Sequence, residues 1–519
     1  MRYDIRYSLN SLLPLLAGII FISTSDSTQH PVVVPVIGPN RVRLLQTIAG
    51  RIVSALMAYA PFAGGSTQPW AIQQVQRCLG IALACFVLFH LLNWRKPRVA
   101  WLPVLAGLLA LLLGWFMVYN AHTVWDPFHA RAVPRLPRFP LLPGAEEMLT
   151  ARLAMQRLDV LFGAFLIVYD MAAERLWRRE WMLVIAGTGA ACAVFGIAQQ
   201  AGFATFVPTR MYQMEGVYFA TYNYHGNAGA LMNLAEATIC GFCLYVFAGR
   251  RSIKKKVAAV AILLVILLGQ FTNSSRGAQA IAVVMLLAMA MVAAATVGAS
   301  RRSWFTRRRV LLPVICGVLL ILLLPAFMLS HGNIEKWREL PKHAAHNSSR
   351  WQVWKVTMAM VRAEGPLGYG PGSFKLLLPQ SKNLTHAFYS RWVIQTHTPG
   401  GNISMWSMAH NDLLQGLVEH GWVGLLCSMC MLGCGLVIGV WRYTVICKVR
   451  AYQDAGLLLG CIAGVCATLV HSMFDFPLQV LSIQLPFAVM LAICWSSTRW
   501  KTHSIARIVE LEPAKQLAS

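Results

Sequence analysis

Long runs of apolar residues recur along the whole chain and are separated by short polar stretches. About 20 predominantly apolar residues suffice to cross a bilayer as a helix. The pattern predicts about twelve transmembrane helices, near residues 8–24, 78–94, 100–119, 158–173, 181–199, 224–248, 256–271, 277–299, 310–330, 421–441, 454–473 and 478–497. Hydrophobic residues make up 57% of the 519 residues and charged residues 13%, which is too little polar surface for a soluble globule. We therefore predict an all-α polytopic membrane protein.

The spacing of these runs divides the chain into five parts, because one polar interval, starting at His331, is far longer than the others. The expected parts are N-terminal transmembrane helices over 1–219, central transmembrane helices over 220–330, a long, partly helical loop over 331–420, C-terminal transmembrane helices over 421–497 and a tail over 498–519.

Two further segments are less apolar than a full span. Residues 47–62 can lie along the bilayer surface, although Arg51 and the Gly64-Gly65 turn argue against a transmembrane helix. The segment from Glu146 to Arg157 is typical of a short surface helix.

The formal net charge of +25 is concentrated in loops between alternate spans. These loops hold the clusters at residues 95–98, 175–179, 250–256, 301–309 and 442–450. If the N-terminus is cytoplasmic, every cluster and the C-terminal tail fall on the cytoplasmic side, as the positive-inside rule requires. The charge is thereby explained without a nucleic-acid partner, and the loop over 331–420 is expected on the opposite side.

Candidate chemistry lies on that opposite side. His410 stands where the long loop re-enters the membrane, ahead of a short amphipathic helix over 411–420 for which Gly421 is a plausible stop. Arg276 lies in a Ser-Ser-Arg-Gly turn, where a guanidinium can bind a phosphate. Arg350 lies in the first turn of a predicted helix that reaches about Glu364, a position unfavourable to the helix dipole unless an anion is nearby.

Other catalytic chemistries find little support in the sequence. The expected outer segments contain no Asp-x-Asp pair, no His/Asp cluster with metal-ligand spacing and no G-x-S-x-G motif, so divalent-metal and serine-nucleophile catalysis are disfavoured and no cofactor is expected. The glycine-rich stretch 365–374 lacks the P-loop pattern and is interpreted as a structural turn. A histidine can still act as a general base while arginines bind a diphosphate leaving group.

Taken together, several motifs resemble the O-antigen ligase and O-antigen polymerase superfamily. They are Ser275-Arg276-Gly277, Arg350-x3-Trp354 followed by Gly365-Pro366-Leu367-Gly368-x-Gly370-x-Gly372-x-Phe374, His410-Asn411-x2-Leu414-x4-Glu419-x-Gly421-x2-Gly424, and His471-x3-Asp475-Phe476-Pro477. The resemblance covers about residues 220–490. It implies a GT-C-like glycosyltransferase of the bacterial inner membrane, metal-independent and inverting, with both termini cytoplasmic and the long catalytic loop periplasmic.

The resemblance also implies the partners and the site residues. The donor is a glycan linked to undecaprenyl diphosphate, and the acceptor is a lipid A core for a ligase, another lipid-linked glycan for a polymerase, or a protein for an oligosaccharyltransferase. By motif match His410 is the catalytic base, and Arg276 and Arg350 bind the donor diphosphate.

Four further residues are candidates for supporting roles, namely Asn223, His225, Glu419 and Asp475. For Glu419 and Asp475 a packing or capping role is an equally good interpretation. For Asn223 and His225, in the polar start of the sixth span, a polar interface between helices is an equally good one. A transporter for the same lipid-linked glycan and a non-catalytic scaffold are the rival hypotheses.

Overall fold

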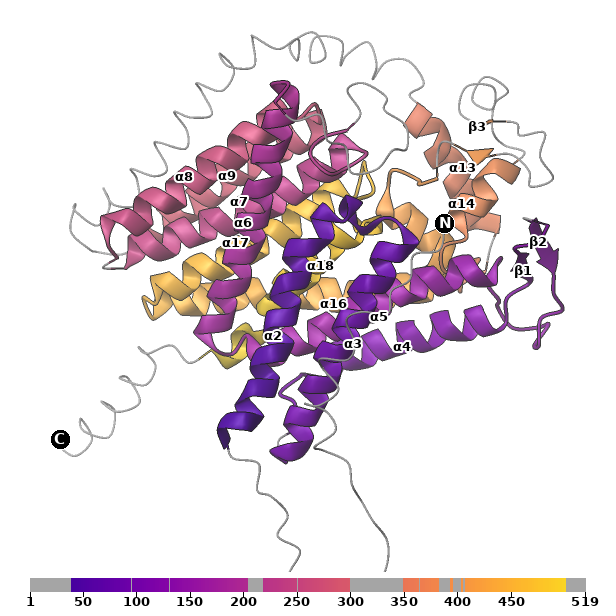
Figure 1. The fold of residues 1–519 in the computed structure, drawn as a ribbon, viewed down its shortest axis with the longest axis horizontal. Coiled ribbons are helices and arrows are strands. Elements are labelled where there is room, and N and C mark those ends of the chain that lie inside the picture. The colour runs from indigo at the N-terminus through magenta and orange to yellow at the C-terminus, as the bar shows by residue number, and fades with distance from the viewer. Residues whose placement is uncertain are drawn as a thin grey trace, which may run out of the picture.

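The computed structural model describes residues 39–94, 96–129, 131–203, 218–249, 251–298, 349–363, 365–381, 393–394, 403–404 and 407–500. Helices dominate these residues and pack side by side into a bundle (Figure 1). The long helices are α2 (Pro39–Phe62), α3 (Pro69–Leu92), α4 (Trp101–Tyr119), α5 (Met148–Met171), α6 (Arg175–Gln200), α7 (His225–Ala248), α8 (Ile253–Thr272), α9 (Arg276–Gly298), α16 (Asp412–Lys448), α17 (Tyr452–His471) and α18 (Leu481–Ser496).

The remaining elements are short and lie in the connections between the long helices. They are the helices α13 (Ser349–Ala363) and α14 (Phe374–Leu377), the 3-10 turns η1 (Gly64–Ser66), η2 (Leu378–Gln380), η3 (Pro477–Gln479) and η4 (Ser497–Arg499), and the strands β1 (Thr123–Asp126), β2 (Arg131–Pro134), β3 (Val393–Ile394) and β4 (Ile403–Ser404). The strands form two antiparallel pairs, β1 with β2 and β3 with β4.

Nine of the described helices are long and apolar enough to cross a membrane, namely α3, α4, α6, α7, α8, α9, α16, α17 and α18. This confirms the prediction of an all-α polytopic membrane protein. The spans predicted near 8–24 and 310–330 lie outside the described residues. The span predicted near 158–173 lies in α5, which is not among the nine because it carries Arg152, Arg157, Asp159 and Asp170.

Two helices are longer than the sequence pattern indicated. The segment 146–157 is not a separate surface helix, because α5 runs without interruption from Met148 to Met171. Glu147 caps α5 by accepting hydrogen bonds from the amides of Leu149 and Thr150, which would otherwise lack partners in the first turn. The segment 47–62 belongs to α2, which forms a hairpin with α3 and buries one face in the bundle core.

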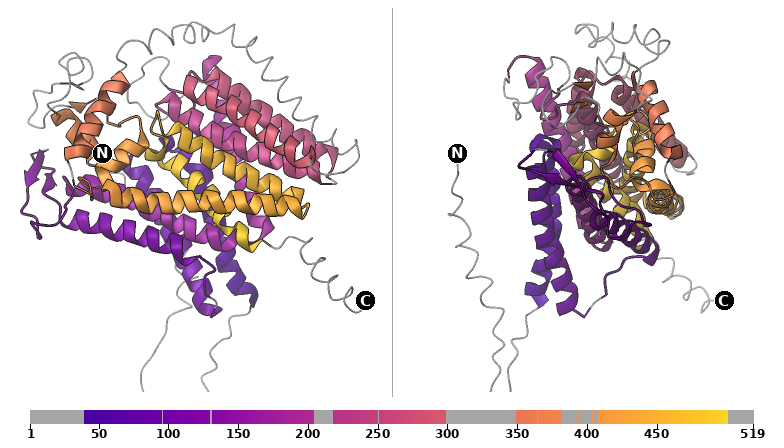
Figure 2. Two further views of the ribbon diagram at one scale, coloured as in Figure 1. Left: turned by 180° about the vertical axis from the view of Figure 1, so that it is seen from behind. Right: turned by 90° about the vertical axis from the view of Figure 1, so that its right-hand side faces the viewer.

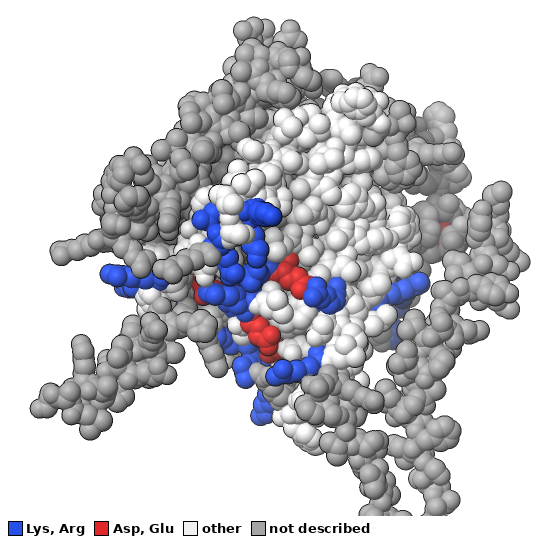
Figure 3. Space-filling view, turned by 60° about the vertical axis from the view of Figure 1, so that its left-hand side comes forward, with Lys and Arg blue, Asp and Glu red and all other residues white. Residues whose placement is uncertain are grey.

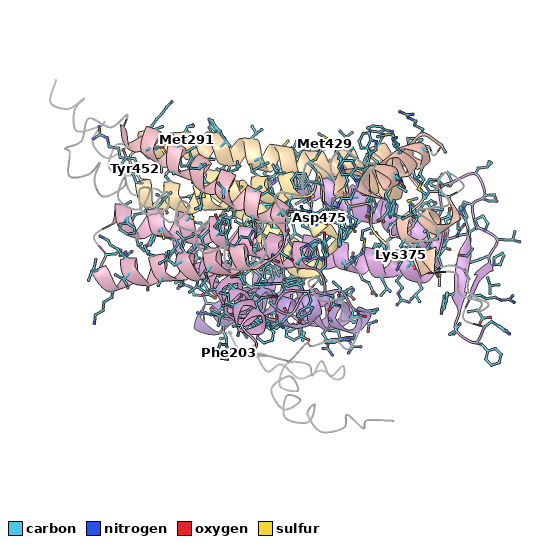
Figure 4. All side chains as sticks on the ribbon, turned by 90° about the horizontal axis from the view of Figure 1, so that it is seen from above. Phe203, Met291, Lys375, Met429, Tyr452 and Asp475 are labelled. Atoms are coloured by element: carbon cyan, nitrogen blue, oxygen red, sulfur yellow. The ribbon has the colours of Figure 1, made fainter. Side chains whose placement is uncertain are left out.

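The centre of the bundle is formed by α7, α17 and α18. In an apolar window of 18 residues, 83% of the residues are buried in α7, 78% in α17 and 89% in the segment formed by α18 and η4, compared with 17% in α16. A side chain at Gly241 of α7 would collide with the backbone of α17 at Gly460, so glycine permits this close approach. Met429 of α16 lies at the edge of the bundle (Figure 4) and is 59% exposed, as expected of a helix that faces lipid.

Basic residues gather at one end of the bundle, where α7 ends and α6 and α17 begin (Figure 3). Asp454 at the start of α17 forms ion pairs with Arg175 and Arg178 of α6 at 2.7 and 3.3 Å. The 20 residues of α17 then lead to His471 at the other end, about 30 Å away at the rise of an α-helix. In Figure 4, Tyr452 and Asp475 accordingly lie well apart.

A small outer layer covers the end of the bundle that lies away from the basic residues. It contains α13 and α14, and it lies at the same end as the β1–β2 hairpin (Figures 1 and 2). Its apolar core consists of Val353, Val356, Phe374, Leu378, Ala409 and Val418. The residues of this core come from α13, α14, η2, the segment just before α16 and the first turns of α16, so the layer fixes the segment that carries His410.

Helix α16 crosses the predicted boundary between the loop and the C-terminal helices. It breaks at Gly421, whose φ of 61° and ψ of −167° are accessible essentially only to glycine, and then continues to Lys448. A Cβ atom on Gly421 would lie 2.2 Å from the carbonyl oxygen of Pro366. Gly421 therefore kinks the helix instead of ending it as the sequence had indicated, and the kink lets the glycine-rich loop pack against α16.

We expect Gly421→Ala to lower the free energy of unfolding by about 3 kcal/mol, because the backbone conformation excludes a side chain and Pro366 occupies its space. Gly416→Ala is the matched control in the same helix, where an added Cβ meets no atom within 4 Å and should stabilise by about 1 kcal/mol. Thermal unfolding in detergent measures both. Equal effects of the two substitutions would contradict this account of the kink.

Candidate active site

The carboxylate of Asp475 is the centre of a polar cluster in the connection between α17 and η3. Its Oδ1 atom lies 3.1 Å from Nδ1 of His410, and its Oδ2 atom accepts a hydrogen bond from the Tyr224 hydroxyl at 3.0 Å. His471 and Arg350 lie 3.7 and 3.9 Å from the same oxygen. Asp475 is 4% exposed, so one buried carboxylate joins groups from four separate segments.

His410 is held by its backbone as well as by its ring. Its φ of 51° lies in the left-handed region, which costs a non-glycine residue about 1–2 kcal/mol. The indole of Trp354 donates hydrogen bonds to the carbonyls of Ala409 and His410 at 3.0 and 3.3 Å. Asn411 caps α16 through the amide of Leu414 and also donates to the carbonyl of Met473. These contacts fix the imidazole against the Asp475 segment.

Arg350 lies in the first turn of α13, as the sequence predicted. Its guanidinium donates to the carbonyl of Phe474 at 2.9 Å and to the hydroxyl of Tyr224 at 3.1 Å. A cation in the first turn of a helix is unfavourable unless an anion is nearby, and the carboxylate of Asp475 is that anion for Arg350. The Arg350 side chain is still 40% exposed, so its guanidinium remains accessible to a further anion.

Arg276 is the first residue of α9, and its helix begins beside the same segment. A Cβ atom on the neighbouring Gly277 would lie 3.6 Å from the ring of Phe474. The preceding turn is tied to the start of α7, because the Asn273 side chain donates to the carbonyl of His225 at 2.9 Å. The structure therefore brings the start of α9 to the Phe474–Asp475 segment that His410 and Arg350 contact directly.

The electrostatics of the cluster follow from burial and from the shared carboxylate. Burial alone would raise the pKa of Asp475, but hydrogen bonds from His410 and His471, together with the Arg350 guanidinium, hold that pKa well below its usual range. Burial lowers the pKa of His410, and the Asp475 carboxylate opposes this effect only in part. Asp475 is therefore ionised and accepts from Nδ1, so that neutral His410 carries its lone pair on Nε2.

The other sequence-predicted residues fall into two groups. Asn223 is exposed just before Tyr224, and the half-buried ring of His225 lies 4.8 Å from that of Tyr224, so both border the cluster. Glu419 lies apart from it. Its buried carboxylate accepts hydrogen bonds from the Gln415 side chain and from the amide of Gly372, both at 3.0 Å, and thus braces the glycine-rich loop.

Sequence reasoning did not select Tyr224 and His471 as site residues. Both contact the carboxylate of Asp475. The four-residue spacing of His471 and Asp475 could have indicated a contact between them, because side chains four residues apart lie on the same face of a helical turn. Nothing in the local pattern distinguished Tyr224 from its polar neighbours. The histidines at 331, 343, 346, 386 and 397 lie outside the described residues.

We expect Asp475→Asn to lower the pKa of His410 further, because the substitution removes the carboxylate that favours the imidazolium. Diethylpyrocarbonate modifies neutral imidazole, so its rate of reaction with the peptide that contains His410, followed by mass spectrometry against pH, reports this pKa. Asp159→Asn is the control, since Asp159 hydrogen-bonds to Trp115 and not to His410. An unchanged or raised pKa in Asp475→Asn would refute the assigned coupling.

Comparison with known proteins shows which family this chain resembles. No curated protein matches the chain. One protein-family model does match, over residues 261–429, and its description is O-Antigen ligase. The matched region contains Arg276, Arg350 and His410, and it ends before Asp475. The resemblance found in the sequence motifs is thus confirmed over residues 261–429, where this polytopic membrane protein is similar to the O-antigen ligase family.

Proposed function

We propose that this membrane glycosyltransferase moves a glycan from undecaprenyl diphosphate to an acceptor hydroxyl, with His410 as the general base. The observation that carries the proposal is the His410–Asp475 pair beside Arg350. A base oriented by a buried carboxylate, next to an accessible guanidinium, suits a reaction that removes a proton at one point and releases an anion at another.

The proposed reaction is a single displacement. Nε2 of His410 takes the proton of the acceptor hydroxyl while the hydroxyl oxygen forms a bond to the anomeric carbon of the donor sugar. The bond between that carbon and the diphosphate oxygen breaks, the configuration inverts, and undecaprenyl diphosphate leaves with the electron pair. Asp475 remains ionised and stabilises the imidazolium that forms, while Arg350 and Arg276 stabilise the charge on the leaving diphosphate.

We place the reaction at the periplasmic face of the bacterial inner membrane, with both termini in the cytoplasm. The support is the separation of the basic end, around Asp454, from the Asp475 cluster by the length of α17. Under the positive-inside rule the basic end faces the cytoplasm. Lipid-linked donor and acceptor would then both reach His410 from the outer leaflet.

The test of the proposed function is transfer by the purified protein from an undecaprenyl-diphosphate glycan to three acceptors, namely lipid A core, a second lipid-linked glycan and a pilin-type protein. Product with any of them supports glycosyl transfer, and the acceptor used distinguishes ligase, polymerase and protein oligosaccharyltransferase. Movement of the donor across liposomes by His410→Gln as fast as by wild type, with no transfer by either protein, would favour the transporter hypothesis.

We expect His410→Gln to lower kcat about 10²–10⁴-fold, the range for loss of a general base, without weakening donor binding. Wild-type activity should fall as the pH decreases through the pKa of His410, because protonation removes the base. Burial lowers that pKa, so the loss of activity should be centred below about pH 6.5. A kcat of His410→Gln within threefold of wild type would rule out this role.

We expect Arg350→Gln to raise the KM for the donor about 10–100-fold, because a charge-assisted contact to diphosphate is lost. Arg362→Gln is the control at the other end of α13, in its last turn. Steady-state kinetics against donor and acceptor separates the two constants, and thermal unfolding checks that the variants fold. A change confined to the KM for the acceptor would show that Arg350 does not bind the donor.

A further inference from the structure

A second pair of cations lies near the candidate active site and has no place in the proposed reaction. Arg157 belongs to α5 and Lys375 to α14, and both lie at the end of the bundle away from the basic cluster. Arg157 donates a hydrogen bond to the carbonyl of Gln479 at 2.8 Å, whereas Arg350 donates to the carbonyl of Phe474. The two guanidinium groups therefore contact opposite ends of the 474–479 segment.

Within the described part of the chain, neither cation has a carboxylate partner. The bond to Gln479 is the only hydrogen bond of the Arg157 side chain there, and no ion pair within 4.0 Å involves Arg157 or Lys375. None of the guanidinium nitrogens of Arg157 is both buried and unpaired, so those without a partner reach the surface. Lys375 is exposed, and in Figure 4 it lies on the far side of Asp475 from Tyr452.

The two cations lie close enough to repel each other. Burial lowers the pKa of Lys375, and the positive charge of Arg157 lowers it further, while Glu419 and Glu147 act in the opposite direction. Those two glutamates are themselves buried and already hydrogen-bonded. Glu147 accepts from the amides that begin α5, and Glu419 accepts from Gln415 and Gly372. Glu419 also attracts Arg157, but its oxygens already accept these hydrogen bonds; of the two cations, Lys375 is exposed and Arg157 is half-buried.

The pair lies within reach of His410. The Gln479 side chain donates to Asp412, two residues after His410, at 3.1 Å. The rings of His410 and Phe476 lie 4.7 Å apart, and three residues of chain from Phe476 to Gln479 span at most about 11 Å. An anionic group bound by Arg157 and Lys375 could therefore present a nearby hydroxyl of the same molecule to His410.

We propose that Arg157 and Lys375 bind a phosphate group of the acceptor at the Gln479 end of the 474–479 segment, while Arg350, at its Phe474 end, contacts the donor diphosphate. This inference rests on the proposed function and narrows the acceptor to a phosphorylated lipid-linked saccharide. Arginine supplies a planar pair of donors and lysine a compact charge, a combination that suits phosphate oxygens. Phosphate of a lipid-anchored core saccharide and diphosphate of a lipid-linked glycan share this chemistry. A protein hydroxyl lacks it.

Transfer kinetics with the full-length protein test the proposal. The acceptors are a phosphorylated lipid A core, the same core after phosphatase treatment, and a lipid-linked diphosphate glycan. We expect Lys375→Gln and Arg157→Gln each to raise the KM for the phosphorylated acceptor about tenfold and to leave the KM for the donor unchanged. For wild type, phosphatase treatment should raise the KM of the core acceptor, and neither variant should raise it further. The acceptor that responds identifies the source of the phosphate.

Matched variants separate charge from structure. Arg152→Gln removes an exposed cation from the same helix and should leave both KM values unchanged. Arg157→Lys should restore part of the lost affinity, since it keeps the charge. Lys375→Gln carries the test if Arg157→Gln unfolds, because Lys375 is exposed and thermal unfolding should show no change in its variant.

Measuring acceptor binding directly, without glycan transfer, tests the phosphate site independently of the proposed function. Binding of phosphorylated acceptor to protein in nanodiscs should weaken in Lys375→Gln and remain unchanged in Arg350→Gln. If that pattern appears with a wild-type protein that transfers no glycan, the phosphate site stands and the proposed function fails. An increase in the donor KM instead of the acceptor KM, no change in either constant, or efficient use of a protein acceptor alone would overturn the inference.

Discussion

The hydrogen-bonded, buried carboxylate of Asp475 is the feature on which the end of the bundle away from the basic residues depends. Removing a carboxylate from water is unfavourable in free energy. Hydrogen bonds and cationic groups from several segments offset this desolvation energy here. Each partner is fixed by satisfying the same charge. His410, Arg350 and Tyr224 are therefore held in fixed orientations around one carboxylate, which is the condition that the proposed general-base and electrostatic roles require.

The length of the bundle helices places the Asp475 cluster at the end away from the basic residues. Because backbone polar groups cannot stay unpaired in lipid, the crossing segments are helices, and their ends are where irregular backbone and charged groups collect. One set of ends holds the ion pairs of Asp454, and the other holds Asp475. The length of α17 sets the separation of the two ends, and close packing against α7 through Gly241 and Gly460 holds α17 in place.

The polar face of the first turns of α16 is buried, and its side chains hydrogen-bond to neighbouring segments. Gln415 and Glu419 bond the chain before the helix and the glycine-rich loop, while Asp412 accepts from the amide of Leu478 and the side chain of Gln479. The helix that follows His410 is thereby joined to both neighbouring connections. The charged groups on this helix serve packing, whereas Lys375 of α14 is exposed and takes no part in these bonds.

The sequence alone determined the class of the protein and the residues worth attention. Hydropathy is a local property, so the nine spans of the described residues could be predicted from it, and motif resemblance selected His410, Arg276 and Arg350. The tertiary structure decided which residues meet. Tyr224 and His471 meet at Asp475, Glu419 does not, and Arg157 of α5 lies beside η3 more than 300 residues along the chain. Such contacts depend on how the helices pack, which no local pattern encodes.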